Sequence, residues 1–128
     1  MKALLDTHVF LWWITDDPRL STVAREIVGD GHHELYLSAA SGWEIAIKAG
    51  LGRLKFGNPI EQEIPRQLSL NNILVLPVHL SHGLAVAALP PLHRDPFDRL
   101  LVAQCHVEQI PILTADALIK KYPVQTLW

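Results

Sequence analysis

The stretch Ala3-Leu4-Leu5-Asp6-Thr7-His8 decides the fold, because a short apolar run ends there in an acid and a helical stretch follows. An uninterrupted apolar run of this length is typical of a strand that is buried on both faces of a sheet. We therefore expect a strand that ends at Asp6 and a helix over residues 8–14. The same succession recurs along the 128 residues of the chain.

Later apolar runs predict further strands at residues 35–37, 73–76 and 111–114, and an edge strand at residues 124–127. Helices are expected at 22–28 behind Ser21, from Ser38 or Ser41 to about Gly50, and at 59–69, 80–89, 95–107 and 116–121. Alternating strands and helices predict an α/β fold with three layers, in which helices cover both faces of a central, mostly parallel sheet of four to five strands. We expect one domain over residues 1–128.

The composition limits the kind of protein. Apolar residues make up 49% of the chain, enough to fill a core, and the net charge of −2 leaves only local patches to attract nucleic acid. The single cysteine, Cys105, allows no internal disulfide, which suits a reducing compartment. The N-terminus does not resemble a signal peptide, and no apolar run is long enough to span a membrane. We therefore expect a cytoplasmic protein without a membrane partner.

Four acids, Asp6, Glu44, Asp98 and Asp116, stand where a strand is expected to give way to a helix. In parallel α/β sheets, sites form outside the carboxyl ends of the strands, so these acids are expected to gather at one edge. Two carboxylates about 4 Å apart repel each other by roughly 4 kcal/mol near a protein surface, and a bound cation relieves that repulsion. Oxygen ligands without a Cys or His pattern favour Mg²⁺ or Mn²⁺ over zinc.

Each acid also has a structural explanation. Asp6 and Asp116 would cap helices, and Ser41-x-x-Glu44 matches a capping box. In Asp95-Pro96-Phe97-Asp98, a capping acid precedes a proline at the first helical position. Asp95 is therefore the expected cap of that helix, although it remains a possible further ligand.

Other polar residues near these acids are candidate contacts for a substrate. The hydroxyl groups of Thr7 and Thr114 would hold a carboxylate, a metal-bound water or only the end of a strand. Lys48 would form a salt bridge within its helix or contact a phosphate, and Arg94 and Arg99 would contact an RNA backbone or remain solvated.

The chain lacks the motifs of the competing chemistries. It has no G-x-S-x-G elbow, no paired Cys and His and no Gly-rich phosphate loop, and its seven histidines show no zinc spacing. Metal-assisted hydrolysis of a phosphodiester bond is therefore the leading chemistry. Trp43 is expected to lie in the core rather than to stack on a base.

Four blocks resemble the signature blocks of PIN-domain proteins, most closely the VapC-type toxins of bacterial type II toxin–antitoxin systems. They are Leu5-Asp6-Thr7-His8, Ser41-x-Trp43-Glu44-Ile45, His93-Arg94-Asp95-Pro96-Phe97-Asp98-Arg99-Leu100-Leu101 and Leu113-Thr114-Ala115-Asp116. The resemblance covers essentially the whole chain and follows the family's order. A single block is weakly specific, whereas four blocks in order are strongly so.

The resemblance implies a Mg²⁺- or Mn²⁺-dependent endoribonuclease that forms a homodimer and is inhibited by a cognate VapB-type antitoxin. Asp6, Glu44 and Asp98 match the acids at the core of the family's site, and Asp116 matches a more variable fourth acid. These residues are expected to hold one or two ions, with Asp116 orienting a metal-bound water for attack on RNA.

Two other functions compete with this interpretation. The first is a phosphoryl-transfer or receiver-like domain that binds magnesium, although such domains usually carry an acidic pair near the first strand. The second is a non-catalytic binding module in which the acids only cap helices.

Overall fold

The computed structural model describes all 128 residues, and its centre is the apolar run that opens the chain. Strand β1 (Lys2–Leu5) is followed along the chain by β2 (Glu34–Ser38), β3 (Ile73–Leu76), β4 (Ile112–Leu113) and β5 (Thr126–Leu127). They form one sheet in the order β3-β2-β1-β4-β5, and every neighbouring pair is parallel. The expected parallel sheet is confirmed, with β5 at one edge.

The helices alternate with these strands as the sequence predicts. They are α1 (Thr7–Ile14), α2 (Thr22–Gly29), α3 (Ala39–Gly50), α4 (Ile60–Leu70), α5 (Leu80–Ala85) and α6 (Pro96–Glu108), with short 3₁₀ turns η1 (Val86–Ala88) and η2 (Ile119–Lys121). No helix combines the length and the apolar character that crossing a membrane would require.

Side-chain caps fix the starts of four helices, of which α1 is capped by Asp6. The Ser21 hydroxyl accepts a hydrogen bond from the Ala24 N–H, and the Asp95 carboxylate accepts one from the Phe97 N–H. Ser38, rather than Ser41, caps α3. Such a cap stabilises a helix because its first N–H groups have no partner within the helix.

Three expected boundaries were wrong. The helix expected at 80–89 stops at Ala85 and continues as the 3₁₀ turn η1. The helix expected at 116–121 shrinks to the single turn η2, because the Asp116 side chain caps a loop that enters the turn only at Ile119. The strand expected at 111–114 contains only Ile112 and Leu113.

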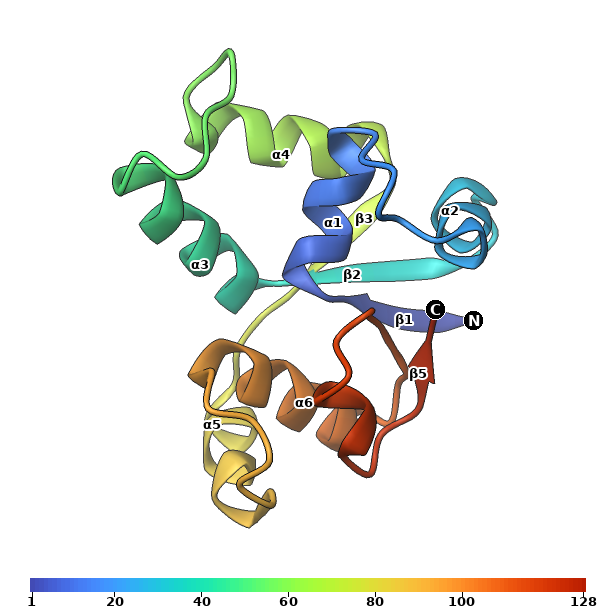
Figure 1. Cartoon of the computed structure of the whole chain (residues 1–128), viewed down its shortest axis with the longest axis vertical. Helices are drawn as coiled ribbons and strands as arrows, with labels where there is room; N and C mark the ends of the chain where they lie inside the picture. The colour runs from blue at the N-terminus through green and yellow to red at the C-terminus, as the bar shows by residue number, and fades with distance from the viewer.

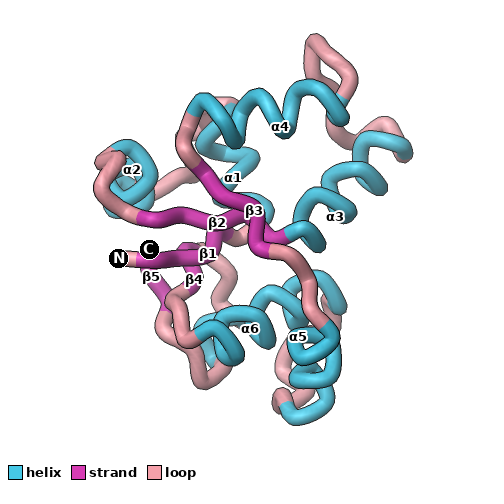
Figure 2. The backbone as a smooth tube through the Cα atoms, turned by 180° about the vertical axis from the view of Figure 1, so that it is seen from behind, coloured by secondary structure: helices cyan, strands magenta, loops and turns pink.

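One hydrophobic core lies on each face of the sheet. On one face, Ala3, Leu5 and Leu37 pack against α1, α2, α3 and α4. On the other face, Leu4 and Ile112 pack against α6. Figures 1 and 2 show α5 and α6 on the opposite side of the sheet from the other four helices. The expected three-layer arrangement is therefore confirmed, and both α3 and α6 begin near the carboxyl ends of the central strands.

Candidate active site

Asp6 and Thr114 lie side by side because β1 and β4 are neighbours in the sheet. Asp6 directly follows β1, and Thr114 directly follows β4. The Thr114 hydroxyl donates a hydrogen bond of 2.6 Å to Asp6 Oδ2, while the His8 N–H donates to Oδ1 at 3.1 Å. Asp6 is therefore held at both oxygens, and it also serves as the N-cap of α1. Its capping role and its place at the sheet edge coexist.

Two more carboxylates come from the helices next to this edge. Glu44 lies within α3, and Asp98 lies in the first turn of α6. Only 5% of Glu44 and 6% of Asp98 is exposed, compared with 3% of Asp6. Charged acids are rarely buried unless a partner compensates them. The burial of three acids around one edge is therefore the main electrostatic feature of the molecule.

A histidine joins two of the predicted acids. His93 Nε2 lies 3.0 Å from Asp116 Oδ2 and 3.1 Å from Asp98 Oδ2. One potential ligand atom from each of these three residues falls within 4.8 Å of the others. His93 was not predicted as a site residue, because a histidine in a loop has no spacing that marks it. The available signals were its place at the start of the third sequence block and its position two residues before the capping Asp95.

The hydrogen bonds of His93 indicate which nitrogen carries the proton. Its Nδ1 accepts a hydrogen bond from the Asp95 N–H at 3.1 Å, so the proton of the neutral ring sits on Nε2. In this tautomer Nε2 donates toward the acids and has no free lone pair for a metal. His93 therefore acts as a hydrogen-bond donor to Asp116 and lies within ion-pair distance of Asp98.

The environment shifts the pKa values of these acids in opposite directions. Burial, together with the charges of Asp6 and Asp95, raises the pKa of Asp98 to about 7. Burial also acts to raise the pKa of Asp116, but hydrogen bonds from His93 and from the Leu118 and Ile119 N–H groups lower it overall. Asp98 is thus the member of the group whose charge is least compensated by its neighbours.

The residues present fit a divalent cation. Glu44 Oε1 is buried and has no hydrogen-bond partner, while Glu44 Oε2 lies 3.0 Å from Lys48 Nζ. An unpartnered carboxylate oxygen beside another acid with a raised pKa is the pattern that a bound cation would satisfy. The available ligand atoms are carboxylate oxygens, since Nε2 of His93 carries a proton, and this set favours Mg²⁺ or Mn²⁺.

The raised pKa of Asp98 predicts a specific pH dependence of stability without metal. Because the folded protein holds this proton up to about pH 7, whereas an ordinary Asp releases it near 3.8, stability from this residue is complete below about pH 4 and is lost as the pH rises through 7. With a chelator present, we expect Asp98→Asn to be more stable than the wild type at pH 8, and this excess to vanish near pH 4.

Urea unfolding across this pH range measures the difference. Asp16→Asn is a suitable control, because Asp16 is a highly exposed acid in the turn after α1, where its surface ion pair with Arg25 contributes little to stability. An excess stability of Asp98→Asn that stays constant with pH would contradict the assigned shift.

The other candidate residues have different surroundings. The Thr7 hydroxyl donates to the Ser41 hydroxyl at 2.7 Å, so it joins α1 to α3 rather than holding a carboxylate. Arg94 is exposed and forms no ion pair. Arg99 donates to the carbonyl oxygens of Val86 and Leu89, so it anchors η1, and its contact with RNA stays a prediction. Asp95 caps α6 as expected.

The prediction for Trp43 was wrong. Its side chain is not in the core, since 64% of it is exposed, and its ring meets the edge of the Phe97 ring at a centroid distance of 5.2 Å. Helix α3 turns its buried face toward the sheet with Glu44 and Ile45, which leaves the neighbouring Trp43 at the surface.

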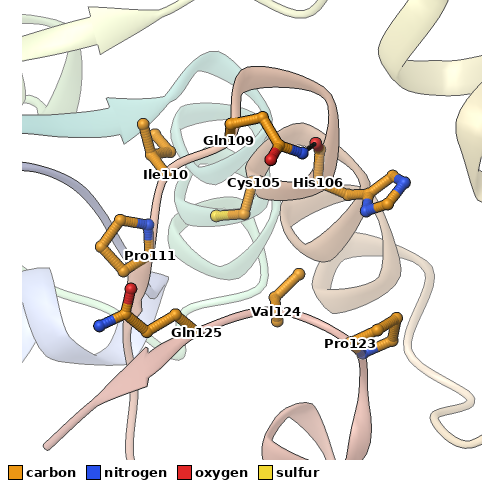
Figure 3. Close-up of a pocket in the computed structure, with 8 residues that line it drawn as sticks. All are labelled: Cys105, His106, Gln109, Ile110, Pro111, Pro123, Val124 and Gln125. Atoms are coloured by element: carbon orange, nitrogen blue, oxygen red, sulfur yellow. Dashed lines mark hydrogen bonds between the residues drawn. The ribbon is translucent and has the colours of Figure 1, made fainter.

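A different cavity lies at each of the two edges of the sheet. A cavity of about 310 Å³ is lined by both Asp6 and Asp116 at the carboxyl edge. A cavity of about 170 Å³ lies at the opposite edge, where segments 109–111 and 123–125 precede β4 and β5 (Figure 3). Cys105 lines that second cavity, and burial raises the pKa of its thiol to about 12, so it is no nucleophile. The acidic edge is therefore the candidate site.

Comparisons with known proteins identify the family and the fold of the chain. Ribonuclease VapC22 of Mycobacterium tuberculosis is 29% identical, with 98% of each chain covered. The crystal structure of VapBC2 from Rickettsia felis bound to a promoter DNA fragment superposes with a TM-score of 0.73 at 14% identity, covering 99% of this chain and 98% of that one.

A toxin-antitoxin complex from Klebsiella pneumoniae gives a TM-score of 0.67 at 12% identity, covering 98% of this chain and 96% of that one. At such low identities these two structures support the fold alone. The family assignment rests on residues 3–125, which match the PIN domain. Since this match spans nearly the whole chain, the protein belongs to the PIN domain family.

Proposed function

We propose that this protein is a metal-dependent endoribonuclease and the toxin of a type II toxin–antitoxin pair of the VapC type. The observation that carries the proposal is the burial of Asp6, Glu44 and Asp98 around one edge of the sheet, with a carboxylate oxygen of Glu44 left unpartnered. Membership of the PIN domain family and the similarity to Ribonuclease VapC22 point to RNA as the substrate.

In this proposal Asp6, Glu44 and Asp98 hold one or two Mg²⁺ or Mn²⁺ ions. When bound, such an ion lowers the pKa of a water molecule and offsets the charge that develops on the phosphoryl oxygens. Asp95 stays the helix cap, and its charge acts to raise the pKa values of Asp98 and His93.

The chain's own residues position the reactants. The Thr114 hydroxyl fixes one oxygen of Asp6, which keeps the carboxylate oriented. The His93 N–H holds Asp116 at the rim of the acidic cavity, where this carboxylate accepts a hydrogen bond from the attacking water. Asp116 is charged at neutral pH, and its lowered pKa makes it a weak base, so its role is to orient the water by a hydrogen bond and not to take its proton.

Protein partners complete the proposal. Leu74 and Val75 are exposed on the edge strand β3, and Leu80 and Leu84 are exposed on α5. Exposed apolar side chains on an unpaired sheet edge suit a protein interface. We propose that this protein forms a homodimer and binds a VapB-type antitoxin in the cytoplasm, where its RNA substrate would be found.

The topology disfavours the receiver-like alternative. Receiver domains have the strand order 2-1-3-4-5, whereas this sheet has the order 3-2-1-4-5. A non-catalytic module remains the competing function, and an activity assay separates the two.

The purified protein should cleave RNA with Mg²⁺ or Mn²⁺, lose cleavage in excess chelator, and recover it when the metal is restored. Products resolved on a denaturing gel provide the measurement, with a single-stranded DNA of the same sequence as the comparison. Full cleavage in excess chelator would exclude the metal mechanism, and no cleavage of any RNA with either metal would favour the binding module.

A further inference from the structure

A third cavity, different from the one lined by Cys105, adjoins the acidic cavity. It has a volume of about 260 Å³ and lies between α1, α3 and the loop 51–59 that follows α3. We call it the α1–α3 cavity, and its main lining residues are Leu11, Trp12, Lys48, Leu54, Lys55 and Phe56. His8, Trp12 and Arg19 line both this cavity and the one that contains Asp6 and Asp116. The two hollows therefore lie side by side and share a wall formed by these three side chains.

The α1–α3 cavity combines an apolar interior with a cationic rim. Leu54 and Phe56 are half-buried and pack against the main core, so they form a firm base. Lys55 is exposed and forms no ion pair, and Lys48 reaches the cavity from α3. Flat apolar surfaces beside cations are the chemistry that binds single-stranded nucleic acid, since bases stack and phosphates are neutralised.

Arg19 is already held in place at the junction of the two cavities. Its Nε and Nη2 donate to the two carboxylate oxygens of Asp17 at 3.0 and 2.8 Å, and its guanidinium lies 5.0 Å from the centre of the Trp12 ring. A guanidinium fixed in this way loses little side-chain entropy on meeting a phosphate, and its Nη1 remains without a partner in these contacts.

Charge argues for a nucleotide as the occupant. The cavity is lined by three cationic side chains, Arg19, Lys48 and Lys55. Arg19 pairs with Asp17 and Lys48 pairs with Glu44, so Lys55 is the cation without an acidic partner. The protein as a whole carries a net charge of −2, so the uncompensated charge of Lys55 is a local attraction for a phosphate. When a phosphodiester of an RNA strand lies at the acidic site, the neighbouring nucleotide of that strand would lie in the α1–α3 cavity.

We propose that the α1–α3 cavity is a subsite for one nucleotide of the RNA strand, next to the phosphodiester that is cleaved. The base contacts Trp12 and Phe56, and the phosphate contacts Lys55 and Arg19. This inference rests on the proposed ribonuclease function and identifies the part of the protein that grips the strand beside the scissile bond.

Binding tests the subsite without relying on cleavage. In an Asp6→Asn background, short fluorescent RNAs are lengthened by one nucleotide at a time, at the 5′ end in one series and at the 3′ end in another. One added nucleotide in one series should tighten binding by about 3- to 10-fold. Lys55→Gln and Arg19→Gln should each remove that gain in affinity. Each should also reduce the slope of log K, where K is the association constant for RNA, against the logarithm of the salt concentration by about 0.7.

Lys2→Gln is the matched control. Lys2 lies at the opposite edge of the sheet in a weak, exposed pair with Glu34, so its loss removes the same charge without touching the cavity. In an otherwise wild-type protein, Lys55→Gln should raise KM more than it lowers kcat, whereas Lys2→Gln should change neither.

Three outcomes would overturn the proposal. The first is that Lys55→Gln and Arg19→Gln keep the full gain in affinity from the added nucleotide. The second is that Lys2→Gln loses as much of this gain as they do. The third is unchanged RNA binding with weaker binding of an acidic protein segment, which would assign the cavity to a protein partner. A wild-type protein that binds RNA through this cavity but never cleaves it would refute the proposed activity and leave the subsite standing.

Discussion

Asp6→Asn is expected to lower RNA cleavage by more than about a hundredfold, since loss of even an outer partner of a metal ligand costs ten- to a hundredfold. The change removes one charge from the acidic edge but keeps the local structure. Asn is as good an N-cap as Asp, so it can still accept the His8 N–H at the start of α1. Initial rates with saturating Mg²⁺ provide the measurement, and circular dichroism checks the fold.

Asp95→Asn is the matched control for this experiment. It removes a carboxylate only three residues from Asp98, and the new side chain can still cap α6 through the Phe97 N–H. Because Asp95 raises the pKa of Asp98, its loss should change the pH dependence of cleavage slightly while most activity remains. If Asp6→Asn and Asp95→Asn lost cleavage activity equally, Asp6 could not be assigned as a metal ligand and Asp95 as only a helix cap. Full cleavage activity in Asp6→Asn would refute the proposed site.

Mg²⁺ is expected to raise the melting temperature of the wild type and to leave that of Asp98→Asn nearly unchanged. A ligand present at a hundred times its dissociation constant stabilises a protein by about 2.7 kcal/mol, which corresponds to about 10 °C for a domain of this size. Without metal the order should reverse, because Asn at position 98 relieves the repulsion that raises the pKa of the native carboxyl.

Calorimetry or differential scanning fluorimetry at pH 8 measures this crossing, with and without a chelator. Asp16→Asn again serves as the control and should respond to Mg²⁺ as the wild type does. If Asp98→Asn gained as much from Mg²⁺ as the wild type, Asp98 would not be a ligand. If neither protein responded at any concentration, the acids would be helix caps only. Such a trade between stability and function is common at active sites.

Features that depend on neighbours in sequence could be predicted well. The apolar run of β1 is fully buried, β3 occupies residues 73–76 as expected, and the Asp95-Pro96 pair starts α6 at the expected residue. These features depend on local chemistry, namely hydrophobic periodicity and the need to cap the first N–H groups of a helix. The positions of the acids at strand ends follow from the same chemistry, once the sheet is parallel.

Features that depend on distant residues could not be predicted. His93 contacts Asp116 across 23 positions of sequence, Arg99 reaches the carbonyl oxygens of η1, and Trp43 stays exposed beside the buried Glu44. The cavity beside the acids likewise requires α1, α3 and the loop after α3 to meet.

The sequence by itself determined the α/β fold, the helix caps and the identity of the acids, because each depends on residues within a few positions of one another. Only the tertiary structure decided which tautomer His93 adopts, which carboxylate oxygen lacks a partner and which cations share a wall with the acids. Those properties depend on distances between side chains from different elements, and such distances are set when the layers pack together.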